Sequence, residues 1–296
     1  MTSPTTGGTL FLVATPVGNL GDVTLRAIDV LRAVPLIAAE DTRISRRLLA
    51  RHEIATRMIS YHARSGPGRF AELLAHLRSG SDLALVTDAG TPGVSDPGTE
   101  LAAAWAAEGG RVEAIPGASS VLAAVAGSAI AGPRWTFEGF LPRGGTARRQ
   151  RLARLAADER GALIFEAPGR LRATLLDLAK ACGPARPGAV CRELTKLHEQ
   201  IVRGSFADLA VHVASGSVPA KGEVVIVVGW DPAAAERSDR AGPGTGADGD
   251  SDAEAAARRE VEALVAGGLG RSDAARRVAA SSGIPRRRLY RPRPDG

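Results

Sequence analysis

A loop rich in glycine and proline at residues 88–98 constrains the fold of this chain more than any other stretch. The apolar run Leu83–Val86 lies just before it and has the length and composition of a buried strand. Residues 99–108 follow it and are predicted to form a helix with Thr99 as its N-cap. The loop is therefore expected at the carboxyl end of a strand in an α/β sheet, where ligands bind in open α/β folds.

The composition of this loop suits contact with a ligand. Its glycines allow the backbone to approach a bound molecule, and its prolines reduce the order that binding must impose. Asp88 and Asp96 supply acceptors for an amine or a hydroxyl group. The alternative is a tight connection built from ordinary turn residues.

Strands and helices alternate on both sides of the loop. Strands are expected at residues 9–14, 36–39, 83–86 and 111–115, and helices at 25–33, 45–52, 70–79, 99–108 and 121–128. This order predicts a largely parallel sheet covered by helices. The turn at residues 15–22 contains Gly18 and Gly21 but lacks the GxGxxG spacing, which disfavours a nicotinamide-binding loop.

Polar residues follow two more of the predicted strands. Glu40, Asp41 and Arg43 come directly after residues 36–39 and are either a site or the acidic start of a helix. Ser119 and Ser120 open the next helix and can cap it or bind a ligand carboxylate beside its free N–H groups. These residue types at strand ends indicate one site built from several loops.

The second half of the chain predicts another α/β unit after a linker at residues 129–133. Residues 135–142 open this unit. Strands are expected at 162–165, 189–191 and 224–228, and helices at 171–181 and 206–214, the latter capped by Ser205. Residues 143–154 carry five arginines and no acid. They form either a solvated helix face or a segment that binds phosphates.

The C-terminal region differs in composition. Residues 231–253 hold six acids and two arginines without apolar periodicity, which predicts a disordered linker. Helices are expected at 254–267 and at 270–283, the second capped by Ser272 and ended by Gly283, with a third from Ile284. Residues 254–296 contain ten arginines and five acids, so this helix-turn-helix-like tail either binds nucleic acid or is a basic docking appendage.

The whole-chain composition limits the class of protein. The net charge of +6 favours an acidic partner without identifying it. Cys182 and Cys191 lack metal-ligand spacing and fit a reduced compartment, so no metal site is expected. No apolar run is long enough for a secretory signal or a membrane span, and we expect a cytoplasmic protein.

Seven short motifs, taken in order, resemble the tetrapyrrole methylase superfamily, in particular its branch that methylates small-subunit ribosomal RNA. The motifs are TPVGNLGD at 15–22, AEDTR at 39–43, DAGTP at 88–92, PGASS at 116–120, FEGFLP at 137–142, RELTK at 192–196 and KGE at 221–223. Each is weak alone, but seven in order at predicted strand ends are highly specific. The resemblance covers residues 9–229, and the tail is similar to the C-terminal helices of some bacterial members.

The resemblance implies a two-domain α/β fold with S-adenosylmethionine in the cleft between the domains. The expected divisions are an N-terminal α/β domain (1–131), a C-terminal α/β domain (132–230), an acidic linker (231–253) and a basic helical tail (254–296). It also implies 2′-O-methylation of a cytidine ribose in the decoding region of small-subunit ribosomal RNA, and a homodimer. The RNA itself or the assembled small subunit is the expected partner.

The family motifs place the cofactor site on particular residues. In the first domain these are Pro16, Gly18, Asp88, Ala89, Gly90, Thr91, Pro92, Val94, Ser95, Ser119 and Ser120. In the second they are Glu166, Ala167, Pro168, Leu194 and Gly222. The chain departs from the family at Gly169, where the family often has histidine, which argues against an essential catalytic role for that position.

The proposed acceptor, a ribose hydroxyl, needs a base, because it is a poor nucleophile while it keeps its proton. We expect the Glu40–Asp41–Arg43 cluster to orient the ribose and take the proton, with Glu193 and Lys196 as other candidates. In the alternative, these acids form salt bridges that hold the cleft. The residues expected to bind RNA are Arg143, Arg148, Arg149, Arg192, Lys196, Arg286 and Arg287.

Two rival functions use the same fold. A small-molecule methyltransferase acting on a tetrapyrrole is disfavoured by the basic tail and the arginine-rich segment. A non-catalytic RNA-binding assembly factor is disfavoured by the intact motif at residues 88–92. Failure to bind S-adenosylmethionine would favour the assembly factor.

Overall fold

The computed structural model describes residues 7–95, 98–183, 186–234 and 248–282, with Ile284 and Leu289. The predictions for Gly283, Arg286 and Arg287 lie outside the described residues, as does the linker at residues 235–247. The chain divides into two compact units, one formed by Met1–Leu155 with Arg160–Asp231 and the other by Ala156–Glu159 with Pro232–Gly296. Each unit is described by itself.

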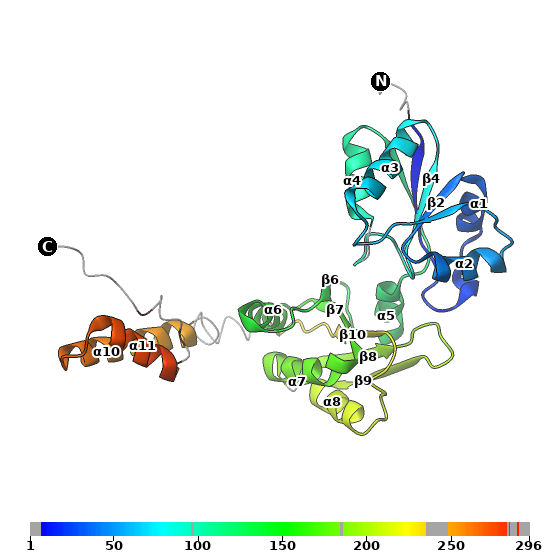
Figure 1. The fold of residues 1–296 in the computed structure, drawn as a ribbon. Coiled ribbons are helices and arrows are strands. Elements are labelled where there is room, and N and C mark those ends of the chain that lie inside the picture. The colour runs from blue at the N-terminus through cyan, green and yellow to red at the C-terminus, as the bar shows by residue number, and fades with distance from the viewer. Residues whose placement is uncertain are drawn as a thin grey trace. The chain divides into compact units, whose positions relative to one another are not determined.

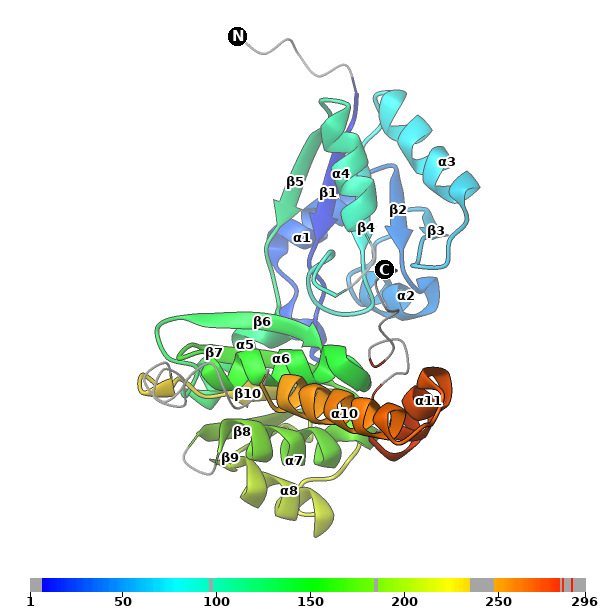
Figure 2. The same ribbon diagram turned by 90° about the vertical axis from the view of Figure 1, so that its left-hand side faces the viewer.

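Five parallel strands form the first sheet (Figure 1), and Figure 2 shows their order, β3-β2-β4-β1-β5. They are β1 (Thr9–Val13), β2 (Leu36–Ala39), β3 (Met58–Ser60), β4 (Leu83–Val86) and β5 (Arg111–Ile115). The prediction of a parallel sheet is confirmed, although it omitted the three-residue strand β3. Because the strands are parallel, the loops after all five meet at one edge of the sheet.

Helices cover both faces of this sheet. The helices are α1 (Leu25–Ala33) and α2 (Thr42–Arg51) on one face, and α3 (Pro67–Arg78) and α4 (Thr99–Ala107) on the other. A 3₁₀ turn, η1 (Leu20–Asp22), precedes α1. Thr24 caps α1 as expected, since its side chain accepts from the N–H of Ala27 at 3.1 Å.

The prediction that Thr99 caps α4 is wrong. Gly98 is the N-cap residue, and Thr99 is the first residue of the helix. The backbone at Gly98 has φ +125°, and a Cβ there would lie 2.3 Å from Leu85. Only glycine satisfies both conditions, so the chain turns into the helix at this residue.

The second sheet is mixed and has the order β6-β7-β10-β8-β9. Its strands are β6 (Trp135–Phe140), β7 (Gly161–Glu166), β8 (Pro187–Arg192), β9 (Gln200–Ser205) and β10 (Val224–Val228). Strands β6 and β7 are parallel, and the remaining neighbours are antiparallel. All five residues of the central strand β10 are buried, as its unbroken apolar run predicts.

Helix α5 (Ser120–Ser128) lies on one face of this second sheet, opposite α7 (Leu171–Cys182) and α8 (Phe206–Ala214) (Figure 1). Helix α6 (Gly145–Ala157) shares the face of α7 and α8 through Leu152 and Leu155. A 3₁₀ turn, η2 (Pro168–Arg170), leads into α7, and Ser205 caps α8 as predicted. Although α5 follows strand β5 of the first sheet, it packs against the second, so its first turn lies where the two sheets meet.

The C-terminal unit contains α10 (Asp248–Ala266) and α11 (Arg271–Ser282). The two helices pack through small apolar residues, and Arg271 forms a 2.5 Å ion pair with Glu262. Residues 248–253 are helical, so the predicted disordered linker is wrong there, and Ser272 lies inside α11 rather than capping it. No helix among the described residues is long and apolar enough to cross a membrane.

Candidate functional site

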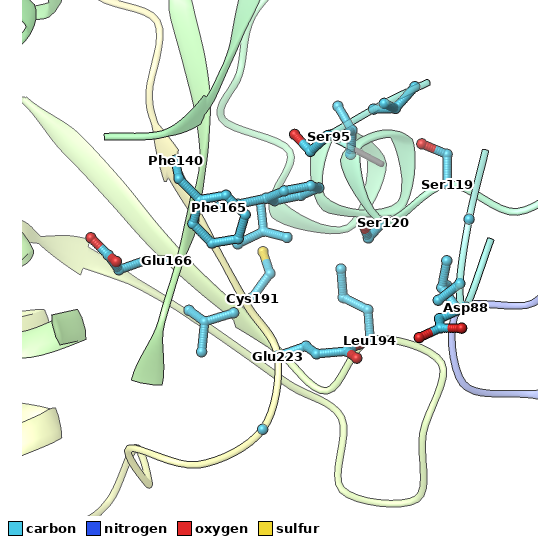
Figure 3. A pocket seen from close by; sticks show the side chains of 18 of the residues that line it. Asp88, Ser95, Ser119, Ser120, Phe140, Phe165, Glu166, Cys191, Leu194 and Glu223 are labelled. Carbon is cyan, nitrogen blue, oxygen red and sulfur yellow. The ribbon is translucent and has the colours of Figure 1, made fainter. Parts of the chain in front are cut away.

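A cavity of about 460 Å³ opens between the carboxyl edge of the first sheet and the second sheet (Figure 3). This volume lies in the range of small-molecule sites. Of the residues predicted to bind the cofactor, those that line it are Asp88, Ala89, Gly90, Thr91, Val94, Ser95, Ser119, Ser120, Glu166, Ala167, Pro168, Leu194 and Gly222. Pro16, Gly18 and Pro92 do not, and the turn at residues 15–22 contributes Val17 instead.

The loop after β4 forms the first wall, and its backbone is held by the turn after β1. Thr15 and Gly90 exchange two backbone hydrogen bonds, at 2.8 Å and 3.0 Å. Gly90 has φ +81° and Ser95 has φ +65°, a left-handed conformation that costs energy for a residue with a side chain. Ser95 lies at the rim of the cavity, so the unusual backbone lies at the candidate site (Figure 3).

The start of α5 forms a second part of this wall. Ser119 caps the helix by accepting from the N–H of Leu122 at 3.4 Å. Of the two predicted roles for this residue, capping is confirmed. Ser120, the first helical residue, also lines the cavity. A helix N-terminus presents free N–H groups and a partial positive charge, which suit a ligand carboxylate.

The opposite wall, from the second sheet, is largely apolar. Phe140 and Phe165 meet edge to face with ring centroids 5.7 Å apart, and Cys191 and Leu194 continue the surface (Figure 3). Burial raises the pKa of the Cys191 thiol to about 12, so it stays protonated and acts as an apolar group. Such a wall suits the flat face of a heterocycle.

Glu166 lies at the far end of the cavity from Asp88 (Figure 3). Its carboxylate accepts from the Thr174 hydroxyl at 2.6 Å and from the N–H of Ala167 at 2.8 Å, and pairs with Arg170 at 3.2 Å. These contacts hold the end of β7 in place. The carboxylate is therefore occupied by the protein and serves as a structural anchor for the wall.

Glu40 and Asp88 form a strand-end pair that links β2 to β4. The N–H of Asp88 donates to Glu40 Oε2 at 3.2 Å, and Asp88 Oδ1 accepts from the N–H of Asp41 at 3.0 Å. Burial, followed by the neighbouring charge of Asp88, raises the pKa of Glu40 above its usual value. Burial also raises the pKa of Asp88. Both side chains line the cavity, and no lysine or arginine forms an ion pair with either among the described residues.

The side chains of Asp41 and Arg43 pair with each other rather than with Glu40 or Asp88. Asp41 is the N-cap of α2, accepting from the N–H of Arg43, and its carboxylate pairs with the Arg43 guanidinium at 2.5 Å. The hydrogen bond from Arg43 lowers the pKa of Asp41 to about 2. Neither residue lines the cavity. Of the three residues of the predicted catalytic cluster, only Glu40 therefore lines the cavity.

A lysine cluster formed by Glu193, Lys196 and Glu223 lies at the edge of the second sheet. Lys196 Nζ is 2.9 Å from Glu193 Oε1 and 3.1 Å from Glu223 Oε2. Burial disfavours the charge on Lys196, but these two hydrogen bonds outweigh it and raise its pKa. The hydrogen bond from Lys196 in turn lowers the pKa of Glu193. Lys196 stays protonated and cannot accept a proton, and the lowered pKa makes the Glu193 carboxylate a weak base.

The expected RNA-binding arginines divide by their surroundings. Arg143 and Arg149 are exposed, whereas Arg192 donates to the backbone carbonyls of Lys221 and His198. Arg148 is 8% exposed and donates to Asp177, Thr174 and the carbonyl of Pro142 at 2.8–3.0 Å. We withdraw Arg148 as an RNA contact, because its guanidinium is enclosed and fully engaged.

Several lining residues have no counterpart in the sequence prediction: Val121, Phe140, Phe165, Cys191, Glu223, Val224 and Val225. Most lie on strands of the second sheet, where alternation signals a buried side chain but not a cavity. Gly169 lies in η2 and does not line the cavity. The described residues contain no group of three or more metal-ligating side chains.

Comparison with known proteins identifies the family to which this chain belongs. Residues 9–210 match the family described as Tetrapyrrole (Corrin/Porphyrin) Methylases. A Synechocystis protein named ribosomal RNA small subunit methyltransferase I is 46% identical over 283 residues, which covers 96% of each chain. The Mycobacterium tuberculosis protein of the same name is 39% identical over 286 residues, covering 96% of this chain and 93% of its own.

Solved structures with the same fold are more distant. A cobalt-precorrin-4 methyltransferase aligns with a TM-score of 0.58 at 19% identity, over 75% of this chain and 95% of that one. A Thermus thermophilus uroporphyrin-III C-methyltransferase, complexed with S-adenosylhomocysteine, aligns with a TM-score of 0.54 at 22% identity, over 75% and 97%. At such identities the likeness concerns the fold alone.

Proposed function

Because this chain belongs to the tetrapyrrole methylase family, we propose that it transfers a methyl group from S-adenosylmethionine to small-subunit ribosomal RNA. The finer proposal is that the acceptor is the 2′-hydroxyl of a cytidine ribose in the decoding region. The single observation that carries the chemistry is Glu40, a cavity carboxylate with a raised pKa and no cation paired with it among the described residues. The protein is proposed to act on the small subunit in the cytoplasm, as a homodimer.

The residues present fit the cofactor. The apolar wall of Phe165, Cys191 and Leu194 suits the adenine ring, and the N–H groups at the start of α5 suit the methionine carboxylate. The loop after β4, with its glycine backbone and Asp88, supplies acceptors for the ammonium and hydroxyl groups. When bound, the cofactor supplies an electrophilic methyl group on a sulfonium.

The chain's own task is to align the acceptor and move one proton. The leaving thioether is neutral, so placing the acceptor oxygen in line with the methyl group supplies much of the acceleration. The ribose hydroxyl must lose its proton as the bond forms, and a carboxylate of raised pKa accepts it more readily than one of ordinary pKa. Glu40 has that property and faces the cavity, whereas Asp41, with its pKa near 2, does not.

The test is transfer of labelled methyl from S-adenosylmethionine to small ribosomal subunits that lack their native methylations. We expect label on a cytidine ribose, and its loss in the Asp88→Ala variant, which removes one side chain from the cavity wall. Label on RNA at another position would keep the enzyme but overturn the finer assignment. Cofactor binding with label only on an added tetrapyrrole would move the function to the small-molecule rival, and no cofactor binding would leave the assembly factor.

A further inference from the structure

A second cavity, of about 500 Å³, opens at the same edge of the first sheet. It lies where β3 ends and α3 and α4 begin, and Tyr61, His62, Ser65, Phe70, Thr99 and Glu100 are among the residues around it. None of them belongs to the cofactor cavity or to the motifs that identify the family.

Strand pairing places this cavity beside Glu40. Strand β2 pairs with β3 so that Ala39 lies opposite Ser60, and the N–H of Tyr61 donates to the carbonyl of Ala39 at 2.8 Å. Tyr61 is therefore the neighbour of Glu40 across the two strand ends. Burial dominates the raised pKa of Glu40, but the His62 imidazole is close enough to oppose it. The second cavity is thus one strand away from the proposed base.

Aromatic side chains form the body of this cavity. The Tyr61 side chain is 6% exposed and packs in the core between the sheet and α3, and Phe70 on α3 is partly buried in the same cluster. Tyr61 lines the cavity, and the hydrogen bonds of the described residues include none from its hydroxyl. A tyrosine hydroxyl can both donate and accept, so this group is available to a ligand in the cavity.

Glu100 determines the charge of the ligand that fits. It is exposed in the first turn of α4, lines the cavity, and pairs with no cation among the described residues. A carboxylate beside a tyrosine hydroxyl disfavours a phosphate and favours a neutral group that donates N–H. Adenine, guanine and cytosine carry such donors on a flat ring that stacks on aromatic side chains.

The surroundings favour a base that belongs to an RNA chain. Helix α2 begins directly after the strand-end pair and carries Arg43, Arg46, Arg47 and Arg51, all exposed, with no acid of its own. Exposed arginines bind phosphates without reading sequence, while a cavity with aromatic side chains accepts an unstacked base. The cavity around Tyr61 would hold a nucleobase and the arginines of α2 would bind phosphates, and both lie next to Glu40. Together they suit a single-stranded segment of RNA.

We propose that the cavity around Tyr61 and Glu100 holds the unstacked base of a nucleotide adjacent to the one that is methylated. This inference rests on the proposed function and deepens it. It assigns to the first domain a subsite for the RNA, separate from the cofactor cavity, that fixes which ribose reaches Glu40. The occupant is a base with an exocyclic amino group, because Glu100 supplies the acceptor.

The test compares steady-state methylation of small ribosomal subunits by Tyr61→Phe, Glu100→Gln and Glu53→Gln. The first two remove only a hydroxyl or a charge, and the third is a matched control that removes an exposed carboxylate lining neither cavity. We expect Tyr61→Phe and Glu100→Gln each to raise the KM for subunits about fivefold or more, as one lost base contact implies. The kcat and the Kd for S-adenosylmethionine should stay within about twofold.

The outcomes separate the two proposals. The KM should change little in Glu53→Gln, so an equal rise in the control would show a general charge effect and overturn the subsite. An unchanged KM in both cavity variants, with an active wild type, would overturn the subsite and leave the methyltransferase. If the wild type binds the cofactor but labels no RNA, the proposed function fails, and the subsite fails with it.

Discussion

The strand-end pair and the lysine cluster each contribute a carboxylate to the wall of the cofactor cavity, and their surroundings are opposite. The strand-end pair, Glu40 and Asp88, is partly buried and linked through backbone N–H groups. The lysine cluster holds its two carboxylates, Glu193 and Glu223, against Lys196 Nζ. The pKa of Glu40 is raised by burial, whereas that of Glu193 is lowered by its hydrogen bond from Lys196. A carboxylate beside the cavity is therefore a stronger base when no cation is paired with it, as at Glu40, than when a lysine is, as at Glu193.

The comparison assigns proton transfer to the strand-end pair and structural closure to the lysine cluster. Gly18 supports the second assignment, because a Cβ there would lie 2.4 Å from Lys196 Cγ. The lysine stem therefore packs directly on the turn that follows β1. The cluster thus holds the second-sheet loop against the first-sheet turn, within one compact unit.

The largest effect is expected from Glu40→Gln. The amide keeps the acceptor oxygen for the N–H of Asp88 but cannot take a proton at neutral pH. The kcat should fall by about 10²–10⁴, the usual contribution of a general base, with cofactor binding retained. Single-turnover methylation and calorimetric titration with S-adenosylmethionine would measure the two quantities. Full activity of this variant would contradict the assignment of proton transfer to the strand-end pair.

The next effect concerns stability and separates two adjacent arginines of α6. Arg148→Leu leaves Asp177 and Thr174 without their donor and should lower the free energy of unfolding by about 2–3 kcal/mol. Arg149→Leu, on the exposed face, should change it by less than about 0.5 kcal/mol while raising the KM for RNA. Urea unfolding of both variants measures this difference. Equal losses of stability would contradict the buried role of Arg148.

A smaller effect is expected at the lysine cluster. Lys196→Met keeps the apolar stem against Gly18 but leaves two ionised carboxylates together. Activity should fall about fivefold to tenfold, as the loss of roughly 1–1.4 kcal/mol of ion-pair contacts implies. Addition of Glu193→Gln to this variant should restore part of the loss, since it removes the repulsion. A fall as large as that of Glu40→Gln would indicate that Lys196 takes part in the chemistry.

The smallest effect is expected from Asp41→Asn. Asparagine caps a helix about as well as aspartate, so α2 should keep its start. The hydrogen bond from Arg43 lowers the pKa of Asp41 to about 2, so this carboxylate stays ionised across the pH range in which Glu40 titrates. The rate constant for methyl transfer should change by less than about twofold. A loss of a hundredfold would return Asp41 to the catalytic cluster.

The sequence predicts the strands and loops that build this site better than the side chains that line its cavity. The bounds of β2, β4 and β10 were correct because each is a short apolar run between polar turns. The loop after β4 was recognised because its glycines and acids stand at a strand end. Strand β3 was missed, since its three residues are only partly buried and carry no periodic signal.

The remaining differences depend on tertiary packing. Phe140 and Phe165 lie on strands of the second sheet, and no local pattern indicates that they meet beside the cavity. Arg148 and Arg149 are adjacent in one basic run, yet only the packing of α6 against α7 places one inside and the other outside. Asp41 and Glu40 are likewise adjacent, and the start of α2 separates their roles.

The most direct test is the pH dependence of single-turnover methyl transfer to small ribosomal subunits. A base must be deprotonated to act, so the rate should fall as pH drops through the pKa of Glu40, and this limb should lie above the ordinary glutamate value of 4.5. Asp41→Asn should keep the limb and shift it only slightly to lower pH, because the charge of Asp41 is the smallest of the causes that raise the pKa of Glu40, and Glu40→Gln should remove it. A rate that stays constant well below pH 4.5, or a limb that survives in Glu40→Gln, would contradict the assignment of Glu40 as the base.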